Sequence, residues 1–208
     1  MLRHVVATFA ILVIFTSDIS AQRQAHVHAG GTFAGVYQTQ FDHSVGGLAL
    51  GGSALFGVFV SPRVAIEFEP LFGGPYSWEY TYHPGPSRTA HVVASRHDTF
   101  FSFQIRSRAG DVEPVIGVSI VRGRISRHAT SAGRPYFDDA RAQNGVALVG
   151  GLDGRVELAR RAFFVPTFRV LVVTRSGTAP DPFNDPLGDQ TDTGPLVFRL
   201  GAGMRVTF

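Results

Sequence analysis

The sequence predicts an all-β fold, an eight-stranded antiparallel up-and-down transmembrane β-barrel. Apolar and polar residues alternate at period two along most of the chain, and clusters of Gly, Pro, Asp and Asn interrupt the alternation. The links between the alternating runs are short and long in turn, and the last run ends the chain on an aromatic residue, Phe208. No window after residue 21 shows a sustained helical period with caps, so we expect strands alone.

The first residues predict a secretory signal peptide. Arg3 and His4 precede an apolar run at 5–15, and a short polar stretch leads to a cleavage position after Ala21. A membrane-spanning helix needs roughly 20 apolar residues, about twice the length of this run. The expected organisation is therefore a signal peptide at 1–21 followed by one barrel domain at 22–208.

The composition argues against two classes of protein. The chain has no cysteine, unlike small secreted scaffolds that are held together by disulfides. Charged residues make up 17% of the chain, and the net charge of +3 is carried by arginine without lysine. We expect no nucleic-acid partner, because neutralising a phosphate backbone requires clustered basic residues. The 24 glycines and 18 phenylalanines suit twisted strands with large outward side chains.

Eight strands are expected, at residues 26–40, 47–60, 64–82, 92–106, 113–125, 145–159, 162–175 and 196–208. The short links are 61–63, 107–112 and 160–161, and the long links are 41–46, 83–91, 126–144 and 176–195. In bacterial outer-membrane barrels the periplasmic turns are short, the outward loops are long, and an even strand count places both chain ends in the periplasm. Each link falls on the side that this arrangement requires.

The last expected strand shows the two faces most clearly. An apolar row runs from Leu196 to Phe208 and opposes a row that contains Arg199 and Arg205. The same division recurs in most of the other expected strands. A soluble barrel would hide the apolar row, whereas a membrane barrel would expose it to lipid.

The strand expected at 113–125 is ambiguous. Its apolar row continues into Arg122 and Arg124. Either a bulge reverses the register near Val121, or the two arginines lie beyond the hydrocarbon.

Three features favour the membrane over a soluble barrel: the C-terminal aromatic, the unequal links, and a row of aromatic residues that leads toward a long link. Amphipathic aromatic rings are typical of the boundary between hydrocarbon and headgroups. We therefore expect an aromatic girdle made of Tyr76, Trp78, Tyr80 and Tyr82.

The end of the chain resembles the C-terminal assembly signal of outer-membrane barrels. Residues 201–208 read GAGMRVTF, in which Gly203, Met204, Val206 and Phe208 match the pattern. Val206 is hydrophobic, as the pattern requires, but it stands where a second aromatic is common. In architecture, nearly the whole chain after residue 21 is similar to the small eight-stranded outer-membrane proteins, such as the OmpA membrane domain and OmpX. The resemblance implies location in the outer membrane, contact with outer-membrane lipid and lipopolysaccharide, insertion by the barrel assembly machinery, and a monomer.

The polar row is expected to fill the barrel interior with paired charges. Eight strands leave room only for side chains, and a buried charge is tolerated when it finds a partner. The expected network has five residues of each sign: Glu67, Glu69, Glu113, Asp153, Glu157, Arg106, Arg155, Arg169, Arg199 and Arg205. A gated ion path through these residues is the alternative.

Other polar groups give weaker signals. His26 and His28 lack a third metal ligand at a convincing spacing, and we expect them to lie at the rim in water. The acidic link at 176–195 lacks the spacing of a calcium loop, although it contains Asp181, Asp185, Asp189 and Asp192. We expect no metal and no cofactor.

The sequence has neither the G-x-S-x-G nor the H-E-x-x-H motif of hydrolases. The crude candidates for catalysis are Ser95, His97 and Asp98, or His128 with Ser131. His97 and Asp98 are adjacent on a strand and therefore point to opposite faces.

We expect a non-enzymatic outer-membrane protein with a structural or adhesive role, whose barrel is an anchor and whose long links meet the exterior. An outer-membrane lipid hydrolase or acyltransferase, a narrow diffusion pore and a soluble periplasmic carrier are the alternatives.

Overall fold

The computed structural model describes residues 27–38, 47–85, 88–176 and 196–208. The expected signal peptide and most of the links expected at 41–46 and 176–195 lie outside these ranges. Within them the chain forms strands β1 (Val27–Gln38), β2 (Gly47–Ser61), β3 (Val64–Gly73), β4 (Tyr76–Gly85), β5 (Arg88–Ser107), β6 (Val112–Ser131), β7 (Arg134–Gly154), β8 (Val156–Ala159), β9 (Ala162–Ser176) and β10 (Leu196–Thr207). No helix in the described ranges is long and apolar enough to cross a membrane.

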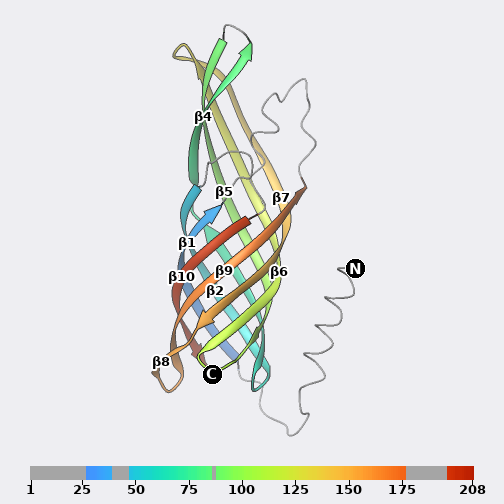
Figure 1. Ribbon diagram of the computed structural model, residues 1–208, viewed down its shortest axis with the longest axis vertical. Coiled ribbons are helices and arrows are strands. Elements are labelled where there is room, and N and C mark those ends of the chain that lie inside the picture. The colour runs from blue at the N-terminus through green and yellow to red at the C-terminus, as the bar shows by residue number, and fades with distance from the viewer. Residues whose placement is uncertain (1–26, 39–46, 86–87, 177–195) are drawn as a thin grey trace.

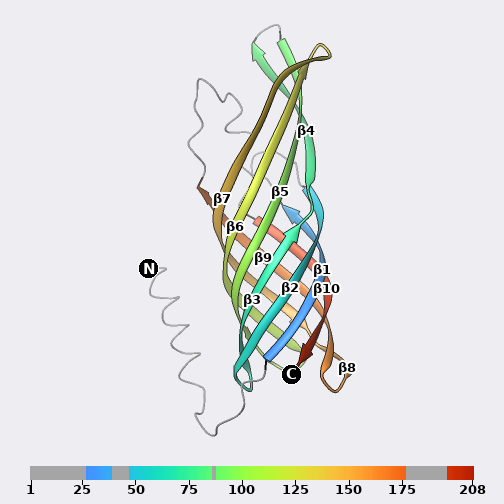
Figure 2. The ribbon, with the colours of Figure 1, turned by 180° about the vertical axis from the view of Figure 1, so that it is seen from behind.

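The strands close into an antiparallel ring. The order among the described strands is β10, β1, β2, β3, β5, β6, β7 and β9, and β9 pairs with β10 to complete the circle. Two expected strands are each divided, since β4 extends β3 and β8 follows β7. The ring therefore confirms the eight-stranded up-and-down barrel, with tilted strands visible from both sides (Figure 1, Figure 2).

The barrel wall has the two faces that the alternation predicts. Outward side chains are apolar and exposed, as at Phe33, Leu148 and Leu200. Inward side chains on the same strands are buried, as at Arg199 and Arg205. The apolar band faces away from the interior, which is the arrangement of a membrane barrel and the opposite of a soluble one.

Four strands continue beyond the closed ring as a protruding β-ribbon. It comprises β4 and the adjoining parts of β5, β6 and β7, and it extends away from the end that carries the C-terminus (Figure 1). The link expected at 126–144 is wrong, because β6 and β7 stay paired throughout and join at Ala132 and Gly133. Both residues have positive φ, as a two-residue hairpin turn with the correct twist requires. Most of the link expected at 83–91 is also strand.

The ambiguity at Arg122 and Arg124 is resolved in favour of a continuous register. The pairing of β5 with β6 runs without a shift, and the pairing of β6 with β7 shifts only between Ala129 and Thr130. No bulge lies near Val121. Both arginines consequently stay on the outward face, above the apolar band.

Candidate functional site

A cluster of paired charges fills the half of the barrel that is nearer the C-terminus. Arg106 on β5 lies at its centre and donates to both carboxylate oxygens of Glu67, with distances of 2.6 Å from Nε and 2.8 Å from Nη2. Its Nη1 also donates to Glu113 at 3.1 Å and to Asp153. One buried guanidinium thus holds three buried carboxylates from three other strands.

Two further arginines share these carboxylates. Arg205 on β10 donates to Glu113 at 2.5 Å and approaches Asp153 at 3.4 Å. Arg169 on β9 donates to the other oxygen of Asp153 at 2.5 Å. Glu113 and Asp153 therefore each have more than one cationic partner, which offsets the cost of taking the charges out of water.

A second group adjoins the first toward the middle of the barrel. Arg199 pairs with Glu69 at 2.6 Å and donates to Ser53 and Thr32. The Ser53 hydroxyl in turn donates to Glu69 at 2.6 Å. Gln104 links the two groups, because its amide donates to Glu67 at 3.3 Å and to Glu69 at 3.2 Å. Every strand of the ring contributes a side chain to the combined charge cluster.

His28 belongs to this cluster, contrary to the expectation of a rim residue in water. Its ring is fully buried, and Nε2 lies 2.6 Å from a carboxylate oxygen of Glu67. The alternation of the first strand could have indicated this inward position, because His28 belongs to the polar row of that strand. His26 lies outside the described residues, and no described group of His, Asp and Glu has metal-binding geometry.

Two residues expected in the network lie outside it. Arg155 is only half-buried and stacks over the Phe163 ring at 4.4 Å, and Glu157 is exposed. The reason is the length of β6. Its first residue, Val112, pairs with Gly154, so the chain after Gly154 has only β9 as a neighbour and lies at the open end of the barrel.

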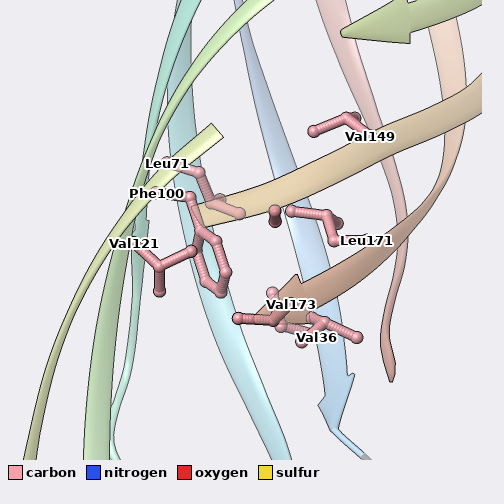
Figure 3. Close-up of a cluster of buried hydrophobic side chains, with 9 residues drawn as sticks. Val36, Leu71, Phe100, Val121, Val149, Leu171 and Val173 are labelled. Atoms are coloured by element: carbon pink, nitrogen blue, oxygen red, sulfur yellow. The ribbon is translucent and has the colours of Figure 1, made fainter. Parts of the chain in front are cut away.

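An apolar layer occupies the interior above the charges. The sequence did not reveal it. Phe100 is its largest side chain, and inward side chains of six other strands belong to the same cluster (Figure 3). The members of the layer are Val36, Leu71, Phe100, Val121, Ala147, Val149, Leu171, Val173 and Val197. A cavity of about 10 Å³ remains beside Arg106 and Arg169, roughly enough for one water molecule. Side chains therefore fill the described interior in two layers.

The ribbon carries its own polar pairs. Arg96 donates to Asp98 at 2.8 Å, and Arg127 pairs with Asp139. Burial raises the pKa of the Asp98 carboxyl, although Arg96 acts in the opposite direction. Both pairs lie beyond the apolar band. Arg96 and Asp98 belong to the same strand, β5, whereas the Arg127–Asp139 pair joins β6 to β7.

Tyr76 does not take the girdle position that the sequence predicts. From the Phe72–Thr99 pair to the Tyr76–Arg96 pair, one strand advances four residues and the other three, which reverses the side-chain parity. Tyr76 therefore packs against buried Ala94 and Ile125. The side chains of Trp78, Tyr80 and Tyr82 lie outside the described part of the structure, so their girdle role stays a prediction.

The segment that resembles an assembly signal forms the closing strand. Met204, Val206 and Phe208 are on its outward face, and the backbone N–H of Phe208 donates to Val27 at 2.8 Å. Gly203 lies against β1, where a Cβ would overlap the carbonyl oxygen of Gly31. The glycine is thus needed for the close approach of the first and last strands.

The candidates for catalysis are not brought together. His97 is exposed on the outer face and Asp98 is buried on the inner one. Farther out on the ribbon, His128 faces Asp138 at 3.6 Å on the surface, and the Ser131 hydroxyl donates to the Thr89 carbonyl. The acidic residues expected to be solvated, Asp181, Asp185, Asp189 and Asp192, lie outside the described residues.

The closed ring, the outward apolar band and the filled interior define a class, the small outer-membrane β-barrel proteins. Solved structures of this class are similar to the chain. A major outer membrane protein from Thermus thermophilus aligns with a TM-score of 0.57 and 12% identity, over 89% of this chain and 100% of that one. Ail, the attachment invasion locus protein of Yersinia pestis, aligns with a TM-score of 0.53 and 10% identity, over 88% and 99%. No protein-family model and no curated protein sequence matches the chain.

Proposed function

We propose that the chain is a non-enzymatic integral outer-membrane protein whose barrel anchors the protruding β-ribbon outside the membrane, for a structural or adhesive role. The observation that carries this proposal is the combination of a filled interior with strands that continue far beyond the apolar band. Ion pairs and a tight hairpin turn hold the ribbon in a fixed conformation, so it presents a constant surface to a partner. In the same class, Ail is named the attachment invasion locus protein, a name that is consistent with this role.

The interior favours an anchor over the alternative of a diffusion pore. The charge cluster and the apolar layer both span the barrel, and a conducting path would have to break several buried pairs at once. We expect planar-bilayer recordings of the refolded protein to show no stepwise conductance. Regular steps that change when Phe100 is replaced with alanine would contradict the anchor and support the pore.

Two partners and a monomeric state are proposed with this function. Outer-membrane lipid covers the apolar band, and the barrel assembly machinery inserts the chain through its last strand. The protein acts as a monomer, since a closed ring leaves its barrel strands without free edges.

The proposed role is tested by shortening the ribbon. Residues 74–97 are replaced with a short Gly/Ser turn and residues 124–142 with Asn-Gly, which joins the Gly123–Gln143 pair by a two-residue turn. Cells that display the full chain should adhere to immobilised extracellular-matrix protein or sulfated polysaccharide, and cells with the shortened chain should not. Both chains should keep the heat-dependent gel mobility of a closed barrel. Full-chain cells that adhere no better than cells without the protein would refute the adhesive role.

A further inference from the structure

Two arginines lie on the outer wall at the upper border of the apolar band. Arg122 and Arg124 follow each other on the outward face of β6, and both are exposed. Among the described residues, neither makes an ion pair with a carboxylate. Exposed arginines usually need no explanation, but these two lie where the apolar surface of the wall gives way to polar surface.

The border between apolar and polar surface is sharp at this place. In the pairing across β5, β6 and β7, one row consists of Phe101, Ile120 and Val146. The next row on the same face consists of Thr99, Arg122 and Asn144. Successive rows on one face are about 7 Å apart. The guanidinium of Arg122 is therefore within reach of the level at which lipid headgroups begin.

The following row strengthens the positive character of this patch. Arg124 is paired across the strands with His97, which is exposed on the same outer face. The carboxylates of the ribbon are elsewhere. Asp98 and Asp139 pair with inward arginines, while Glu79 and Asp138 pair with histidines two rows farther out.

We propose that Arg122 and Arg124, with His97 beside them, bind the phosphate of a lipid in the outer leaflet of the membrane. Guanidinium groups bind phosphate oxygens by paired charge-assisted hydrogen bonds. Thr99 and Asn144 supply neutral hydrogen-bonding groups on both sides of Arg122. The acyl chains of the bound lipid lie along the row of Phe101, Ile120 and Val146. This inference rests on the proposed membrane anchor and names a lipid partner for its wall.

The test compares two lipids that differ only in phosphate. The full-length barrel is refolded in a zwitterionic detergent and titrated with lipid A carrying its two phosphates, or with the same lipid A after removal of the phosphates. Native mass spectrometry measures the bound fraction. We expect the phosphorylated lipid to bind about tenfold more tightly, a preference that corresponds to roughly 1.4 kcal/mol.

The variant Arg122→Gln/Arg124→Gln should lose this preference. Its matched control is Arg160→Gln/Arg161→Gln, which removes two exposed arginines from the turn at the opposite end of the barrel and should keep the preference. Equal binding of the two lipids by the wild type, or an unchanged preference in the first variant, would overturn the proposal. Displacement of lipid A by inorganic phosphate at a similar concentration would also overturn it, in favour of a site for soluble anions.

Heat-dependent gel mobility is recorded for every variant. A chain that never forms a closed barrel would refute the proposed membrane anchor itself. A closed barrel without lipid preference would refute only the phosphate site.

Discussion

Replacing Arg106 with methionine is expected to destabilise the barrel by about 3–5 kcal/mol, because the change leaves buried carboxylates without their central partner. Glu67 would lose two hydrogen bonds from the guanidinium, and Glu113 and Asp153 would each lose one. All three carboxylates are almost completely shielded from water. Urea unfolding of the protein in lipid vesicles measures the loss, from the denaturant dependence of the folded fraction.

The control for this change is Arg160→Met. Arg160 lies exposed in the turn between β8 and β9, and its replacement should change the free energy of unfolding by less than about 0.5 kcal/mol. Adding Glu67→Gln to Arg106→Met should cost much less than the two single changes summed, because the groups share one network. Additive costs, or an Arg106→Met protein as stable as the wild type, would contradict the charge cluster.

Gly203→Ala is expected to impair closure of the ring. The added Cβ would overlap the backbone carbonyl of Gly31 on β1, and neither strand can yield without disturbing its pairing. Overpacking of this kind costs about 1–3 kcal/mol. We expect the folded fraction after refolding, measured by heat-dependent gel mobility, to fall severalfold.

Gly150→Ala is the matched control, because a Cβ at this glycine of β7 meets no atom within 4 Å. The two variants make the same chemical change, each in a strand that has a neighbour on both sides. The Gly150 variant should refold like the wild type. If the two variants refold equally well, the tight seam between the first and last strands is not required for closure.

The sequence predicted the barrel and much of its interior because the pleat of a strand ties parity to side-chain direction. Arg199 and Arg205 alternate with large apolar residues, so their inward placement follows from the pattern alone. His28 shares the polar row but was assigned to water, because a lone histidine at the start of a strand gives no sign of the carboxylate it meets. Its partner, Glu67, is 39 residues away in the chain.

The ribbon could not be predicted from composition. The region around the turn contains Pro135, Asp138 and Asp139, which are typical of loops, yet each of these residues is paired with a residue of β6. Ala132 adopts a positive φ that few residues other than glycine favour. Of the Asn-Gly or Asp-Gly pair that is typical of such a turn, the sequence therefore shows only the glycine, Gly133. The inward orientation of Tyr76 depends on a one-residue offset in the pairing of two strands. The sequence of either strand alone gives no sign of such an offset.

The apolar layer was missed for a different reason. In β9, the inward residues Leu171 and Val173 alternate with outward Val170 and Val172, so both faces are apolar. Alternation disappears where the interior is itself apolar, and only the closed ring reveals which residues meet. Leu171 belongs to the same buried cluster as Phe100 of another strand, an association that depends on the curvature of the whole barrel.

The central claim is that the outward band lies in lipid while the ribbon on the same wall lies outside it. Trp78 is the only tryptophan in the chain, so a Trp78→Phe background allows a single new tryptophan to be placed by substitution. Leu148→Trp and Ala142→Trp lie on one face of β7, three rows apart. In vesicles of lipids brominated on the acyl chain, fluorescence of the Leu148→Trp protein should be strongly quenched and that of the Ala142→Trp protein should not. Equal fluorescence from both proteins, with no quenching by the brominated chains, would contradict the membrane barrel.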